Sequence, residues 1–175
     1  MEIEAVRAAL TALRTAHDEL AACGIDTLTR DELLAVADDL EILDRQLPTQ
    51  RHRILTQLQT QATPREVGAK SWREVLMTRW RLSSGQAHRR LAEAAVLGPR
   101  RALSGQPMAP LLAATAAAQA LGLITPEHVD VMSKGMAKLP RRLDPAARDQ
   151  IEVDWVREAV GTGPKELADT VARTL

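Results

Sequence analysis

The chain has 175 residues and is 45% apolar, enough for one domain with a core or two small helical lobes and too little for a large multidomain enzyme. Its 29 Ala and 24 Leu, against 11 Val, 6 Ile and no Phe or Tyr, exclude an all-β fold and predict an all-α one. The formal net charge of zero argues against a protein that simply coats DNA or an anionic membrane with cations.

A first amphipathic helix is predicted over residues 3–20. Apolar residues recur along it at spacings of three and four, which is typical of a coiled-coil-like seam, and Gly24 then stops the helix. His17 lies on this seam. We expect a partly buried structural side chain there rather than a ligand, because no second His or acidic pattern accompanies it.

A second seam continues the same spacing over residues 33–58. Thr29 and Glu32 fit a capping box at the start of this helix, and Pro48 either kinks the helix or splits it. Two seams joined by a short turn predict a long antiparallel helical hairpin. We assign residues 1–62 to this hairpin, which is acidic at its start and basic at its end.

Two short helices are predicted over residues 71–97. In the first, Trp72 and Trp80 share a stripe whose spacing is typical of core residues. Ser83 caps the second helix, which ends at Gly98 and carries polar side chains on its outer side. A helix, a tight turn and a second helix that begins with Gln, His and paired Arg are typical of a helix-turn-helix.

The rest of the chain completes a compact helical part, which we assign to residues 63–175. The Ala-rich stretch 109–121 predicts a closely packed helix, and Pro126, Pro145 and Pro164 each fit the first turn of a further helix. The total is about seven or eight helices. The last has no stop signal, so we expect either a longer protein or a terminal helix that needs a partner.

No enzyme motif is found in the sequence, such as HExxH, GxxxxGK[ST], GxSxG or a Cys/His cluster with metal-ligand spacing. Cys23 is the only cysteine, which excludes an intrachain disulfide. Glu127, His128 and Asp130 lie at a helix start, where the dipole favours acids, and we interpret them as structural. We therefore expect no catalytic residue, no metal site and no cofactor in this chain.

The sequence also bears on location. Glu2 and Glu4 stand where a secretory signal would carry Lys or Arg, and the nearly apolar stretch 111–124 is too short and Ala-rich to span a bilayer. With a single cysteine, these features predict a cytoplasmic protein that does not associate with membranes.

The zero net charge hides a strong partition. Residues 1–44 carry three Arg against eleven acids, net −8, whereas residues 45–101 carry eleven Arg and one Lys against three Glu, net +9. Of the 23 cations in the chain, 19 are Arg, which is suited to bidentate contacts with phosphates and bases. The basic segment either contacts nucleic acid or pairs with the acidic segment, within the fold or across a dimer.

DNA binding is the function that the basic segment favours. We expect Arg89 and Arg90 to make the main contacts, with Gln86 and His88 near the groove and the other arginines on phosphates. The predicted DNA-binding residues are Arg79, Arg81, Gln86, His88, Arg89, Arg90, Arg100 and Arg101. The alternative is a protein-protein interaction or dimerisation module in which the seams pair with a second copy or a partner helix.

Four strings in the middle of the chain are distinctive: LGPRRALSGQP at residues 97–107, AATAA at 113–117, GLITPEHV at 122–129 and LP at 139–140. Together they closely resemble the actinobacterial 13E12-repeat family. The string GAKSWREVLMTRWRLSSGQAHRRL at 68–91 also resembles the helix pair of that family.

This resemblance implies a helical N-terminal domain of poorly defined function, commonly joined to a C-terminal HNH endonuclease domain and often encoded in mobile-element-associated copies. HNH chemistry uses a ββα-metal fold with a His base and a divalent metal, and none of that motif is present here. No catalytic residue can therefore be carried over. The implied role is DNA binding or targeting, assembly, or both, for a nuclease supplied elsewhere in the full-length protein.

Overall fold

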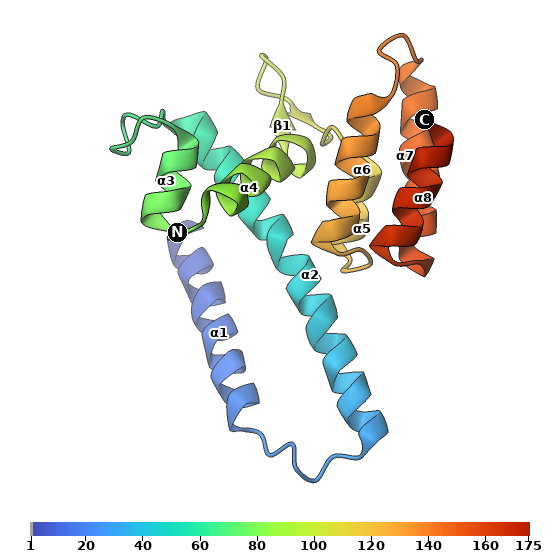
Figure 1. Cartoon of the computed structure of the whole chain (residues 1–175). Helices are drawn as coiled ribbons and strands as arrows, with labels where there is room; N and C mark the ends of the chain where they lie inside the picture. The colour runs from blue at the N-terminus through green and yellow to red at the C-terminus, as the bar shows by residue number, and fades with distance from the viewer. Residues whose placement is uncertain (1) are drawn as a thin grey trace. The chain divides into compact units, whose positions relative to one another are not determined.

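A computed structural model describes residues 2–175, in which the chain forms eight helices and one short strand pair (Figure 1). The predicted all-α fold is confirmed. The chain divides into two compact units, one ending at Asp39 and one covering Leu40–Leu175, and each is described by itself. The division therefore falls earlier than the sequence-based boundary after residue 62, because the later part of the second helix packs against the two short helices that follow it.

The first unit contains α1 (Glu2–Ala22) and the start of α2 (Arg30–Gln61). The predicted capping box at the start of α2 is formed. The backbone N–H of Thr29 donates to Glu32 Oε2 at 2.8 Å, and the backbone N–H of Glu32 donates to Thr29 Oγ1 at 3.3 Å. These bonds satisfy amide groups that the helix itself leaves free, so the sequence set this boundary correctly.

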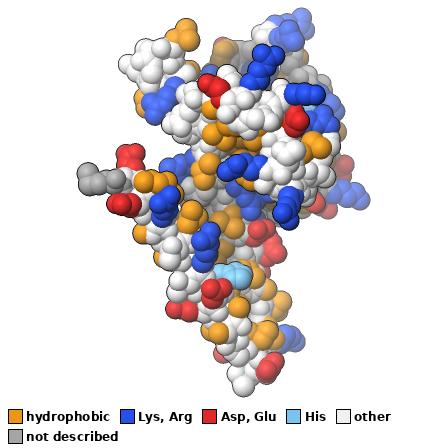
Figure 2. Space-filling model, turned by 90° about the vertical axis from the view of Figure 1, so that its left-hand side faces the viewer, with side chains coloured by type: hydrophobic (Ala, Val, Ile, Leu, Met, Phe, Trp, Pro, Cys, Tyr) orange, Lys and Arg blue, Asp and Glu red, His pale blue; other side chains and the backbone are white. Residues whose placement is uncertain are grey.

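The apolar seam of α1 is not buried. Ile3 is 60% exposed and Leu10 is 48% exposed, and no residue between 2 and 39 is buried. Figure 2 shows hydrophobic side chains lying open along α1 between charged ones. The expectation that His17 is partly buried was wrong, since its side chain is 79% exposed. Periodicity identified an apolar face but could not say what covers it.

The later part of α2 packs against two short helices, α3 (Trp72–Arg79) and α4 (Ser84–Leu97). Their shared core consists of Leu55, Val75, Leu76, Ala87 and Ala94. Pro48 is buried inside α2 without splitting it, although a proline removes one helical hydrogen bond. Ser71 caps α3, and Ser83 caps α4 as predicted and forms a full capping box with Gln86.

Trp72 and Trp80 differ in their surroundings. Trp72 is half-buried against the core of α2, α3 and α4, as predicted. Trp80 instead forms the C-cap of α3 and is 38% exposed, so the prediction that it anchors the core was wrong. The helix ends one residue before Trp80, and Arg81 follows with a φ of 54°, which turns the chain away from the stripe.

A strand pair that the sequence did not predict follows α4. Residues Arg100–Arg101 form β1 and Pro107–Met108 form β2, paired antiparallel with Arg100 opposite Met108. Gly105 closes the turn with a φ of 84°, a conformation that favours glycine. Two residues in each strand do not change the fold class.

The larger core lies among α5 (Ala113–Ala120), α6 (Pro126–Lys138), α7 (Pro145–Gly161) and α8 (Pro164–Thr174). The last three helices lie side by side (Figure 1). Each begins with the predicted proline in its first turn. Ile124, Val129, Met132 and Leu167 are fully buried where the four helices meet. This packing holds the start of α6 next to α4.

Two features are absent from residues 2–175. Within this range, no helix is both long and apolar enough to cross a membrane. Over the same described residues, no three His, Cys, Asp or Glu side chains are grouped so that they could hold a metal ion.

Candidate anion-binding pocket

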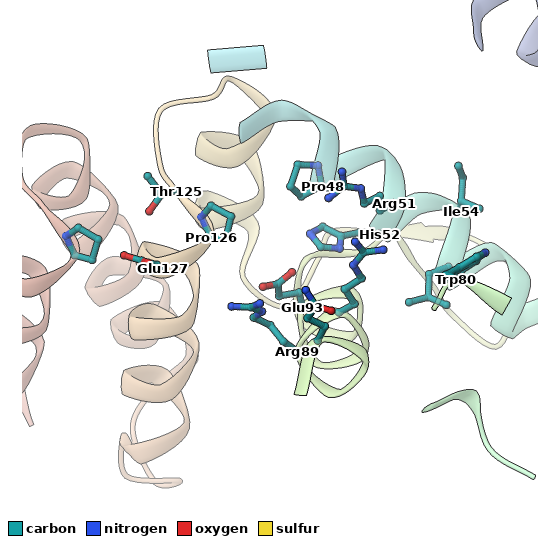
Figure 3. Close-up of a pocket in the computed structure, with 14 residues that line it drawn as sticks. Pro48, Arg51, His52, Ile54, Trp80, Arg89, Glu93, Thr125, Pro126 and Glu127 are labelled. Carbon is teal, nitrogen blue, oxygen red and sulfur yellow. The ribbon is translucent and has the colours of Figure 1, made fainter. Parts of the chain in front are cut away.

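The second unit contains a pocket of about 760 Å³. It lies between the middle of α2, the C-cap of α3, one face of α4 and the start of α6 (Figure 3). Ligand pockets commonly have volumes of about 300–1,000 Å³, so this one is large enough for a small organic molecule or part of a polymer.

Three guanidinium groups line the pocket: Arg51 from α2, and Arg89 and Arg90 from α4. Among residues 2–175, none of these three arginines makes an ion pair. The ion pairs within residues 40–175 join Arg45 to Glu41, Lys134 to Asp130, and Arg157 to Asp154. Burial, together with the charges of Arg51 and Arg89, lowers the pKa of Arg90 from its ordinary value, against the opposing effect of Glu93. The pocket thus concentrates positive charge that no neighbouring carboxylate neutralises at contact distance.

Two acidic side chains line the pocket: Glu93 lies among these arginines, and Glu127 lies at the start of α6 (Figure 3). Glu93 is 9% exposed, and burial raises the pKa of its carboxyl group above the ordinary value, although the charges of Arg89 and Arg90 oppose this. Glu93 follows Arg89 by four residues and Arg90 by three, so all three share one face of α4. The pocket can therefore offer a hydrogen-bond acceptor beside its cations.

His52 lines the same pocket and links α2 to α5. Its Nε2 lies 3.0 Å from Gln119 Oε1, and both side chains are buried. Burial lowers the pKa of His52, as do the charges of Arg51 and Arg90, while the bond to Gln119 raises it. The net direction favours a neutral imidazole that donates to Gln119 and fixes the position of α2 beside the pocket.

Of the predicted DNA-binding residues, three line this pocket: Gln86, Arg89 and Arg90. Gln86 also completes the cap of α4, because its Oε1 accepts a hydrogen bond from the backbone N–H of Ser83 at 3.1 Å. The face of α4 that the sequence placed on the outside is thus the floor of a pocket, and its Glu93 is buried.

The other predicted residues lie outside the pocket lining, and these are Arg79, Arg81, His88, Arg100 and Arg101. All are exposed except Arg100, which is half-buried. The last two hydrogen-bond to backbone oxygens of their own hairpin, at Ala109 and Gly105. The structure therefore does not bring the eight predicted residues together into one site.

Several pocket residues were missed as site residues, among them Arg51, His52, Glu93 and Trp80. Arg51 belongs to the segment of net charge +9, and that imbalance was the available signal. Glu93 could have been found from its helical spacing to the two arginines. The long-range approach of α2 to α4 has no signature in a single sequence.

Comparison with known proteins places the chain in a family. Residues 34–175 match the family described as "Domain of unknown function (DUF222)". The chain belongs to the DUF222 family. The match includes every element that lines the pocket.

Several curated relatives of this DUF222 chain come from mycobacteria, and the three described below are called uncharacterized. One from Mycobacterium tuberculosis is 38% identical over 98% of this chain and 41% of its own length. A second from that species is 41% identical over 84% of this chain and 32% of its own length. One from Mycobacterium bovis is 35% identical over 94% of this chain and 36% of its own length.

The chain thus spans about two fifths or less of the length of these relatives. No solved structure matched it.

Proposed function

We propose that this DUF222 chain is a DNA-binding domain that uses the pocket of Arg51, Arg89 and Arg90 to hold the phosphate backbone. The observation that carries the proposal is the set of three guanidinium groups that share one pocket without an ion-paired carboxylate. Phosphate contacts by Arg supply most of the sequence-independent affinity of DNA-binding proteins.

The physical argument concerns desolvation. Arg90 is half-buried, whereas Arg51 and Arg89 are exposed. Burial of Arg90 beside the other two charges costs free energy, and the lowered pKa of Arg90 reflects this cost. A phosphate group relieves it, because each of its oxygens accepts charge-assisted hydrogen bonds and Arg can donate two at once. An arrangement that is unfavourable when empty and favourable with an anion is typical of a binding site.

The resemblance to the 13E12-repeat family extends the proposal to the longer protein. We propose that the domain targets an HNH-type nuclease in the cytoplasm to DNA, with the catalytic groups and any metal supplied by another part of that protein. The shares of the mycobacterial relatives that this chain covers leave room for such a part in them. This chain would contribute binding and no catalytic residue.

Binding to DNA across a salt series tests the proposal. For Arg89→Ala combined with Arg90→Ala, we expect weaker binding and a plot of log affinity against log salt that is flatter by about two units, one for each lost phosphate contact. Fluorescence anisotropy of labelled DNA measures both quantities.

The matched control is Arg141→Ala combined with Arg142→Ala, which removes two exposed arginines from the turn between α6 and α7 and changes the net charge equally. The proposal is wrong if the intact chain shows no salt-dependent binding, or if the two double variants lose affinity equally.

A second candidate function is self-association through the seams, favoured by the exposure of their apolar residues. Leu40 is 53% exposed and Leu43 is 57% exposed, in addition to the open stripe of α1. Three-four spacing is suited to coiled-coil contact with a second copy of the chain. Residues 1–44 carry a net charge of −8, so like-charge repulsion opposes this contact at low salt.

For Leu40→Asp combined with Leu43→Asp, we expect a folded dimer to become a folded monomer in light-scattering mass measurements. Because salt screens the repulsion, dimerisation should strengthen as salt is raised, the opposite of the expectation for DNA binding. Leu103→Asp, on the fully exposed tip of the strand pair, serves as the control. A monomeric wild-type chain at all salt concentrations would exclude this function.

A further inference from the structure

Trp80 is an unusual wall for a pocket that also contains arginines. It is 38% exposed, and its backbone N–H donates to Leu76 O at 3.2 Å, which fixes it at the end of α3. In Figure 3, Trp80 and Ile54 lie at one end of the pocket, Pro126 and Glu127 lie toward the other, and Arg51, His52, Glu93 and Arg89 lie between them. The indole of Trp80 therefore lines a pocket that also contains the side chains of Arg51, Arg89 and Arg90.

This combination suits the chemistry of a nucleotide. A planar indole and apolar neighbours provide a surface on which a base can stack, while guanidinium groups bind phosphate. Glu93 adds a carboxylate that accepts hydrogen bonds from an amino group of a base. The same carboxylate disfavours a bare anion, so the lining fits a base joined to a phosphate better than it fits an inorganic ion.

The position of α4 argues for an unpaired base. A recognition helix that reads a duplex must enter the major groove, which is about 12 Å wide, with its reading face clear of other elements. Here the face that carries Gln86, Arg89 and Glu93 is the floor of a pocket, walled by Pro48 and Arg51 of α2 and by the start of α6. A stacked, paired base cannot reach Trp80 in such a hollow, whereas an unstacked one can.

A second hollow adjoins the first and gives the rest of the strand a path. Its volume is about 690 Å³, and it shares Gln86, Arg89, Glu127 and Pro164 with the first pocket. Lys134 and Lys165 also line the second hollow, together with the acids Glu127 and Asp130. A single strand can therefore continue over the start of α4 after placing one nucleotide in the pocket.

We propose that the pocket binds one unpaired nucleotide of a DNA strand, with its base against Trp80 and its phosphate between Arg51, Arg89 and Arg90. This inference rests on the proposed DNA-binding function and narrows it. The preferred substrate is single-stranded or locally opened DNA rather than intact duplex.

The test compares a labelled single DNA strand of about 16 nucleotides with its duplex, and with an RNA strand of the same sequence, using the full chain at one salt concentration. We expect the single DNA strand to bind at least about tenfold more tightly than the duplex. Trp80→Ala should weaken single-strand binding by about tenfold, in line with the loss of one stacked base, and leave duplex binding unchanged.

Trp80→Phe is the conservative variant and should restore most of the affinity, since a phenyl ring still stacks. This variant also shows how much of the tryptophan fluorescence change comes from Trp80. Quenching of tryptophan emission on titration with the DNA strand should be smaller in Trp80→Phe than in the wild-type chain, because the remaining Trp72 and Trp155 are half-buried or buried. Equal quenching in both proteins overturns the placement of the base.

The other outcomes separate the two proposals. If duplex and single strand bind equally with a steep salt dependence, the DNA-binding function stands and the nucleotide pocket is wrong. If neither binds, both are wrong. Tighter binding of the RNA strand than of the DNA strand overturns DNA as the source of the nucleotide.

Discussion

Replacing Glu152 by Ala is expected to lower the free energy of unfolding by about 3 kcal/mol. Glu152 lies on α7, is 3% exposed, and accepts hydrogen bonds from Thr115 at the start of α5. The backbone N–H of Thr115 donates to Glu152 Oε1 at 2.7 Å, and its hydroxyl donates to the same oxygen at 2.8 Å. Removing the carboxylate leaves the buried N–H of Thr115 without a partner and leaves its hydroxyl with only the weak acceptor Met132 Sδ at 3.8 Å. This costs more than the loss of a solvated bond.

The local structure of α5 makes this carboxylate important. The N-cap of α5 is Leu112, which has no side chain that can accept a hydrogen bond from the first free amide groups. Glu152 takes this role from another helix and places a negative charge at the positive end of the α5 dipole. The contact therefore gives the donors at the start of α5 an acceptor and joins α5 to α7.

Urea unfolding of the variant, followed by circular dichroism, measures the effect. Asp149→Ala removes an exposed acid from the same helix and should change the stability by less than about 0.5 kcal/mol. Glu152→Gln keeps an oxygen that can accept from the backbone of Thr115 and should lose less than Glu152→Ala. Equal stability of the Glu152→Ala and Asp149→Ala variants would contradict this account of the α5 cap.

Caps show what a single sequence can and cannot predict. Thr29, Ser71 and Ser83 each bond to a residue three positions later, so the pattern that places them is entirely local. The start of α5 is capped by Glu152, which lies 37 residues after Thr115. No residue near α5 in the sequence indicates this hydrogen bond. Local hydrogen bonding is thus readable from sequence, whereas capping by a distant helix requires the fold.

The seams show a second limit. The apolar spacing along α1 predicted a helix correctly, because a helical period needs only the chain itself. The partner of that face is a separate question. The hairpin interpretation assumed that two neighbouring seams bury each other, yet Val6 of α1 and Val36 of α2 are 51% and 42% exposed.

The candidate site was predicted in part for the same reason. Gln86, Arg89 and Arg90 are close in sequence on one helix, and their shared face was evident from spacing alone. Arg51 and Trp80 reach the pocket from other elements, which only the packing of α2 and α3 against α4 determines. Charge partition located the basic segment but could not select which of its arginines share a hollow.

Replacing Trp155 by Ala should be the most disruptive of the changes considered, with a loss of about 4 kcal/mol in the free energy of unfolding. Trp155 is 2% exposed at the junction of α6, α7 and α8, and its Nε1 donates to Thr174 Oγ1 at 3.2 Å. The junction is tight. A Cβ added to Gly135 of α6 would lie 2.6 Å from Val171 Cγ1 and 2.8 Å from Trp155 Cζ3.

Trp80→Ala is the matched control, since it removes the same side chain from a half-exposed position on a different helix. The free energy of unfolding of the Trp80→Ala variant should fall by about 1 kcal/mol or less. Thermal and urea unfolding of this variant and of Trp155→Ala measure the difference. A loss at Trp80 as large as that at Trp155 would mean that Trp80 supports the core. A small loss, combined with weaker binding of the single DNA strand, separates the two tryptophans by role: Trp155 stabilises the fold, and Trp80 is held open at the pocket because its partner there is a ligand.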